Sequence, residues 1–276
     1  MRPELVYNVP ATLLERYLGR KVIVRSTRPA EIVDRLKPDQ LPQVRFVQLL
    51  AMPADIGPLE PWANGLPIDV VLTNPANEFS RLYDYSTLRE THPVRVTVPV
   101  APGFAKAVRV AVALGFAVKL NVGQPDPTLF EELSAVVDFY LHGATVQQPI
   151  EFFQTALLSF YQPQPISFWE VSEEDPRQVR YVTDDGEETI SPRFTGRVPA
   201  MKLNEFVERF RGQMLSEKGE CHDCEFYSRC QGYFKWPDPT YSCAGIRKVL
   251  TTLQDAAREL KSDLQSLAAV QGGLSR

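Results

Sequence analysis

The strongest chemical signal in the chain is a group of four cysteines, the only ones among its 276 residues. Their spacing, C-x2-C-x5-C-x12-C, lets the first two chelate one metal from a tight turn, and the third is near enough for the same loop to fold back. Four thiolates in one compact segment suit either an iron–sulfur cluster or a tetrahedral zinc ion. The segment predicts a metal centre with Cys221, Cys224, Cys230 and Cys243 as ligands. Spacing alone leaves cluster and zinc equally open.

Other side chains near these cysteines could support the centre without binding metal. His222 lies between the first two cysteines, and with four thiols present we expect it to contact a ligand rather than replace one. Arg229 and Lys235 could offset the charge of a cluster or lie in solvent, and the sequence favours neither. His92 and His142 have no cysteine or acidic partner at ligand spacing, so we expect structural roles for both.

Two further groups of polar residues are candidate binding surfaces. The acidic run Glu170, Glu173, Glu174 and Asp175 is typical of a solvated loop, and a docking patch for a basic peptide is the less favoured interpretation. Polar residues at expected strand ends would gather where parallel α/β folds bind ligands, although such residues commonly just face water. They are Arg25, Ser26, Thr27, Gln48, Thr73, Asn74, Asn121, Gln147 and Gln148.

Composition excludes several classes of protein. Hydrophobic residues make up 44% and charged residues 23% of the chain, which argues against wholesale disorder. The formal net charge is −4 and no strong basic run is present, so we expect no nucleic-acid partner. Apolar stretches end well before membrane-spanning length, and residues 1–20 do not resemble a secretory signal. We therefore expect a cytoplasmic protein with reduced thiols and no membrane partner.

Short β-rich runs alternate with helical patterns from residue 20 to about residue 161. The runs lie at residues 22–24, 44–50, 68–72, 94–100, 118–122 and 146–150. Helical patterns lie between them at residues 31–36, 78–88, 104–114 and 126–141, the last with Asp126 as its expected N-cap. This alternation predicts an α/β fold with a parallel sheet, and the length fits a partial (β/α)6 barrel. A doubly wound open sheet is the alternative.

The pattern changes after Tyr161. Two strands, a helix and a long final helix are expected at residues 166–171, 179–183, 201–214 and 246–270, and residues 189–190 could continue a small antiparallel sheet. We therefore divide the chain into an N-terminal extension (residues 1–20), a barrel-like region (21–165) and a metal-binding region with a C-terminal helix (166–276).

The cysteine segment resembles the second auxiliary-cluster segment of SPASM domains, the C-terminal extensions of radical S-adenosylmethionine (SAM) enzymes. Cys221, Cys224 and Cys230 match the first three cysteines of the family's C-x2-C-x5-C-x3-C run, and Cys243 matches a later one. The Gly-Tyr-Phe-Lys sequence at residues 232–235 and the helix after Cys243 are also SPASM-like. The resemblance implies that the four cysteines hold one [4Fe-4S] cluster and that the preceding region is the partial barrel of the same superfamily.

The chain also departs from the family. The family's fourth cysteine would fall at Phe234, so we expect one cluster rather than two. Radical chemistry needs C-x3-C-x2-C after the first strand, and the loop at residues 25–30 has no cysteine. A glycine-glycine-glutamate run that holds the amino group of SAM is also missing near residues 49–57. The resemblance therefore implies a degenerate, pseudo-radical-SAM protein that does not cleave SAM.

These expectations favour a non-catalytic accessory protein that binds one [4Fe-4S] cluster. Its partners would be a peptide substrate or a radical SAM enzyme that modifies a peptide or protein. An electron-transfer iron–sulfur protein is one alternative. A zinc-stabilised barrel enzyme of unknown reaction is the other.

Overall fold

A computed structural model describes residues 4–197, 202–217 and 219–273. Within them one sheet has the strand order β6-β5-β4-β3-β2-β1-β7-β8, and every neighbouring pair is parallel except β7 and β8. The strands are β1 (Val6–Pro10), β2 (Lys21–Ser26), β3 (Val44–Leu50), β4 (Ile68–Val71), β5 (Val94–Pro99), β6 (Ala117–Asn121), β7 (Val179–Val182) and β8 (Glu188–Thr189). The expected α/β fold with a mostly parallel sheet is confirmed. Strands β1 to β6 follow chain order across the sheet, and β7 lies on the other side of β1.

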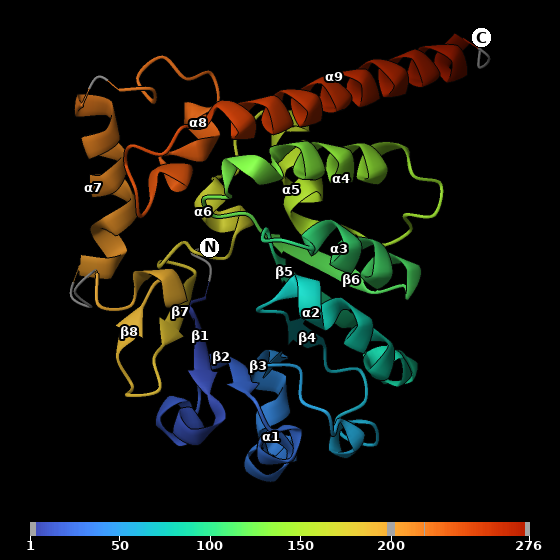
Figure 1. The fold of residues 1–276 in the computed structure, drawn as a ribbon, viewed down its shortest axis with the longest axis vertical. Helices are drawn as coiled ribbons and strands as arrows, with labels where there is room; N and C mark the ends of the chain where they lie inside the picture. The colour runs from blue at the N-terminus through green and yellow to red at the C-terminus, as the bar shows by residue number, and fades with distance from the viewer. Residues whose placement is uncertain (1–3, 198–201, 218, 274–276) are drawn as a thin grey trace.

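Helices surround the outer side of this sheet (Figure 1). The α-helices are α1 (Pro29–Arg35), α2 (Pro75–Glu78), α3 (Phe104–Ala113), α4 (Phe130–His142), α5 (Glu151–Tyr161), α6 (Phe168–Val171), α7 (Leu203–Ser216), α8 (Tyr227–Cys230) and α9 (Ala244–Gly273). Helix α1 packs against β2, and α3 packs against β5 and β6. Helix α9 packs along α4 and α5, and its far end extends past them (Figure 1). No helix in the described ranges has the length and apolarity needed to cross a bilayer.

The two faces of the sheet differ because strand residues alternate between them. On the outer face, valines of five neighbouring strands are fully buried against the helices: Val24, Val47, Val70, Val96 and Val118. This face carries the main hydrophobic core, as expected for a parallel sheet covered by helices. On the inner face a small apolar cluster forms around Ile23, Phe46 and Val179. Many of the remaining inner-face side chains are polar or charged, with the apolar Leu50 and Val71 among them.

Three strand assignments change in the folded chain. Val6–Pro10, within the stretch that we assigned to an N-terminal extension, forms β1 between β2 and β7. The expected strand at residues 146–150 is wrong: only Ile150 makes an isolated bridge, to Val118, because Pro149 has no N–H to donate and α5 begins at once. The expected strand at residues 166–171 is also wrong, since the Ser167 side chain accepts the Trp169 amide and starts α6.

The helical expectations are partly correct. Residues 78–88 do coil, but as 3-10 turns over Phe79–Glu90. Their buried side chains, Leu82, Tyr85 and Leu88, therefore recur every three residues, while Tyr83 is 61% exposed. Asp126 caps the 3-10 turn Pro127–Leu129 that precedes α4. Of the helix expected at residues 201–214, residue 201 lies outside the described residues and the rest falls within α7 or just before it.

A hydrogen-bonded network of polar side chains fills much of the inner face. Asp69, which is 1% exposed, accepts hydrogen bonds from Thr97 Oγ1 (2.7 Å), Gln48 Nε2 (2.9 Å) and Arg95 Nη2 (2.9 Å). The second arm of Arg95 pairs with Glu151 at 2.9 Å. Each buried charge on these strands therefore has a partner of opposite sign, as burial requires.

Glu173 enters this network from the loop after α6. Its carboxylate pairs with Lys119, with Arg45 at 3.1 Å and with Arg95 at 3.6 Å. Burial alone would raise the pKa of Glu173, but these three cations outweigh that effect and lower the pKa to about 2. The carboxylate is therefore far more stable as an anion in the folded chain than in the unfolded one.

Glu173 should make stability depend on acid pH. Because its folded pKa lies below the ordinary value of 4.5, its contribution is complete above pH 4.5 and is lost as the pH falls toward 2. We expect Glu173→Gln to destabilise the protein by on the order of 3 kcal/mol at pH 7. The difference from wild type should shrink steadily below pH 4.5 in urea titrations. A constant difference across this range would contradict the assignment.

Candidate metal centre

All four cysteines line one small cavity. Its wall also contains Glu220, Phe226, Tyr227, Phe234, Lys235, Ile246, Arg247 and Leu250. Helix α8 ends at Cys230, and the chain then reverses through left-handed backbone at Gln231 (φ 50°) and Gly232 (φ 81°). This reversal lets the chain travel out and return to Cys243, just before α9. The ligand set that we expected from spacing is therefore brought together by the fold.

The thiols lie in surroundings that disfavour the unbound thiolate. Cys221, Cys230 and Cys243 are buried, and all four cysteines are free. Burial, with a smaller contribution from the neighbouring cysteines, raises the pKa of the Cys230 and Cys243 thiols to about 12. Binding as thiolates would then need a metal to supply positive charge in the cavity.

The wall of the cavity contains fixed positive charge. Lys235, 5% exposed, donates to Glu220 Oε2 at 2.8 Å, and Arg247 pairs with the other oxygen of Glu220 at 3.2 Å. Glu220 Oε2 also accepts the Cys243 amide at 3.2 Å. Lys235 therefore faces the centre, whereas the other candidate, Arg229, donates to Ser159 O at 2.9 Å and lies 4.8 Å from the Phe160 ring.

His222 takes no part in the wall of this cavity. Its ring Nδ1 lies 2.8 Å from Asp223 Oδ1, and both side chains are largely exposed. His92 has the structural role that we expected, since its two ring nitrogens lie 2.9 Å from the carbonyls of Leu66 and Leu59. His142 is exposed beside Asp138.

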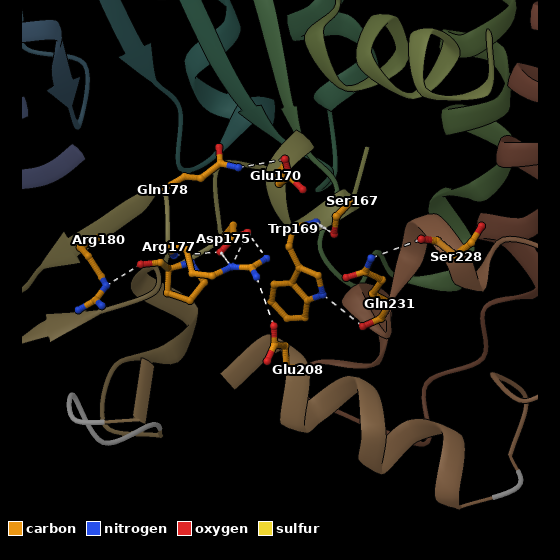
Figure 2. A network of polar contacts seen from close by, with 11 residues as sticks. Ser167, Trp169, Glu170, Asp175, Arg177, Gln178, Arg180, Glu208, Ser228 and Gln231 are labelled. Carbon is orange, nitrogen blue, oxygen red and sulfur yellow. Dashed lines mark hydrogen bonds and ion pairs between the residues drawn. The ribbon is translucent and has the colours of Figure 1, made fainter. Parts of the chain in front are cut away.

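The cysteine segment, residues 221–243, is attached to the rest of the chain through Trp169 and Arg193. The Trp169 indole nitrogen donates to Gln231 O at 3.2 Å, and Figure 2 shows this contact beside the Asp175–Arg177–Glu208 ion pairs. Arg193 pairs with Glu174, donates to Trp236 O at 2.9 Å and lies 4.5 Å from the Tyr233 ring. The contacts of Trp169 and Arg193 thus hold in place the stretch of chain between Cys230 and Cys243.

The acidic run is therefore not a solvated loop, and that expectation is wrong. Each of its carboxylates has a partner within the chain: Gln178 for Glu170, the inner-face cations for Glu173, Arg193 for Glu174 and Arg177 for Asp175. Two of them, Glu174 and Asp175, are almost fully buried. The acidic composition of the run did not reveal this burial, because most of the residues that pair with its carboxylates lie on other helices and strands.

A second cavity, of about 170 Å³, opens on the inner face toward the carboxyl ends of the strands. Of the strand-end residues that we expected there, Arg25, Gln48 and Asn121 line it. Gln148 borders a separate pocket beside His92, and the Thr73 and Asn74 amides bind Glu78. Sequence reasoning missed Asn8, Lys119, Tyr181 and Ser191, whose positions depend on strand pairing across the sheet.

Comparisons with known proteins give no relative from which the function of this site could be inferred. No family model, curated protein or solved structure matches the chain. Among the residues that the structure describes, no three or more Cys, His, Asp or Glu side chains are gathered tightly enough to hold a single metal ion. The cavity that the four cysteines help to line has a volume of about 20 Å³. The case for a metal group thus rests on the chemistry of the donor set, four thiols around one cavity beside a buried lysine.

Arg193→Met should destabilise the protein, because it leaves the Glu174 carboxylate, with an 8% exposed side chain, buried without its cation. Breaking a buried pair in this way costs roughly 3 kcal/mol. Arg258→Met is the matched control: Arg258 pairs with Asp255 in solvent, so its loss should cost less than about 0.5 kcal/mol. Urea unfolding of the metal-free proteins measures both. Equal effects would show that the Arg193 junction contributes nothing.

Proposed function

We propose that this protein is a non-catalytic accessory protein that binds one [4Fe-4S] cluster. The convergence of Cys221, Cys224, Cys230 and Cys243 on one cavity carries the proposal. These residues would hold the cluster, and Lys235 would offset part of its negative charge. A bound cluster can exchange one electron and cross-links four points of the segment.

We further propose that the sheet is a degenerate partial barrel of the radical SAM type. The unreversed strand order from β1 to β6, with helices around the outer side, supports this architecture. The loop after β2 lacks the three thiols that would bind a second cluster, and its own side chains bind one another: Ser26 Oγ donates to Glu31 at 2.7 Å. Arg25 is tied to Asn8 O at 2.8 Å and packs on Tyr181.

The proposed role is to support modification of a peptide or protein by a partner radical SAM enzyme. The lack of radical-SAM cysteines in this chain supports a helper role, since the reactive cluster would have to belong to the partner. The four-thiol centre would then be structural or would relay electrons for that enzyme.

Metal analysis tests the centre directly. Protein prepared without oxygen should contain about four irons and four sulfides per chain and absorb broadly near 400 nm. Cys221→Ala should lower both contents, while a variant at the exposed His222 should keep them. One zinc per chain without sulfide would replace the cluster proposal with a zinc site.

Incubation with SAM and dithionite tests the non-catalytic role. The expected result is no 5′-deoxyadenosine above the protein-free control, because reductive cleavage needs an iron with an open coordination position. Four cysteine ligands leave no such iron at residues 221–243, and residues 25–30 have no thiol. Chromatography quantifies the product. Its formation by wild type and loss in Cys221→Ala would overturn the proposal.

A further inference from the structure

Glu173 has an unusual backbone for a partly buried charged residue. Its φ is +58°, in the left-handed region that favours glycine. Residues other than glycine persist there only where the surrounding structure holds them, and such positions cluster at binding and switch sites. Here the backbone is held at the end of α6, where the Glu173 amide donates to Glu170 O at 3.0 Å and the Glu174 amide to Trp169 O at 2.8 Å, and the Glu173 carboxylate reaches the inner face of the sheet.

Three cations meet this carboxylate, and they come from three strands. Arg45 lies on β3, Arg95 on β5 and Lys119 on β6. Within the described residues Glu173 is the only ion-pair partner of Arg45 and of Lys119. Arg95 is held independently by Asp69 and Glu151 at 2.9 Å each. The sheet itself therefore positions the cations, and the loop supplies only the anion.

Arg45, Arg95 and Lys119 form a cradle for one carboxylate, and their formal charges show what it would bind without Glu173. Three cations, Arg45, Arg95 and Lys119, would face two carboxylates, Asp69 and Glu151, which leaves one positive charge in excess. An unpaired cation in a partly buried site favours an anion strongly. The cradle is thus built for one further carboxylate.

A ligand could reach the cradle through the inner-face cavity. Both Lys119 and Glu173 line this cavity of about 170 Å³. Ser191, also in its wall, is 8% exposed, and its hydroxyl has no hydrogen-bond partner in the part of the chain that the structure describes. A buried hydroxyl of this kind normally has a partner, so it offers a contact for a polar ligand.

We propose that Arg45, Arg95 and Lys119 form a carboxylate-binding site that Glu173 occupies in the free chain, and that a small carboxylate-bearing ligand entering the cavity replaces it. The Ser172–Asp175 loop is then a plug that exchanges with the ligand. This proposal does not rest on the function proposed for the cysteine centre.

Chemical rescue tests the cradle. Glu173→Gly removes a side chain that propionate reproduces atom for atom, and glycine suits the left-handed backbone. At constant ionic strength, propionate should raise the unfolding temperature of Glu173→Gly along a saturable curve. Propionamide, the uncharged analogue, should bind at least about tenfold more weakly. Equal effects of the two compounds would refute a carboxylate site.

Two controls separate this site from general anion effects. Glu173→Gln keeps a side chain that propionate must displace, so propionate should stabilise it at higher concentrations than it does Glu173→Gly. Glu187→Gly removes an exposed glutamate outside the network and should show no preference for propionate over propionamide.

Hydrogen exchange of the wild type tests whether the plug moves. Propionate, and not propionamide, should speed exchange of the amides at residues 172–175, since the ligand competes with Glu173 for the same cations. Exchange that stays unchanged across a full propionate titration of the wild type would overturn the exchange proposal. This measurement also decides the matter if Glu173→Gly does not fold.

Discussion

Charges buried on the inner face of the sheet must balance one another, and much of the tertiary structure follows from that constraint. The outer face buries valines against helices, as parallel sheets usually do. The inner face instead carries Asp69, Arg95 and Lys119, and an unpaired charge there would cost several kcal/mol. The loop after α6 meets this demand by placing Glu173 among the cations, even though its backbone must adopt a left-handed conformation.

The same loop connects the sheet to the cysteine segment, residues 221–243. Glu173 reaches into the sheet, and the next residue, Glu174, pairs with Arg193. Arg193 in turn binds the Trp236 carbonyl, inside the excursion between Cys230 and Cys243. Two successive carboxylates thus link two parts of the chain that sequence patterns describe separately. A structural change in the cysteine segment would therefore reach the inner-face cavity, because Glu174 and Ser191 both line this cavity.

The cysteine cavity combines ligand convergence with a cost for the unbound thiolate. Burial raises the pKa of the Cys230 and Cys243 thiols, so a metal that bound there would have to displace their protons. Lys235, held by Glu220, supplies positive charge on one wall. Aromatic packing around Trp169, Tyr233 and Phe234 keeps the excursion in place beside the body. Metal binding and folding of this segment are expected to be coupled through these contacts.

The sequence by itself determined the parts of this protein that depend on local pattern. Alternating β-rich runs located β2 to β7 within a few residues, and cysteine spacing identified side chains that the fold brings to one cavity. Local pattern failed at residues 146–150 and 166–171, where a proline and a capping serine redirect the chain.

Only the tertiary structure decided which charges are buried. Glu173 and Glu174 look like a solvated acidic run in the sequence, and Val6–Pro10 looks like an extension. Their environments come from partners far along the chain: Lys119 and Arg45 for Glu173, and strands β2 and β7 for β1. Hydrophobic periodicity and residue spacing predict structure only within short stretches of sequence. Ion pairing and strand order depend on which distant segments meet, and that information exists only once the sheet has formed.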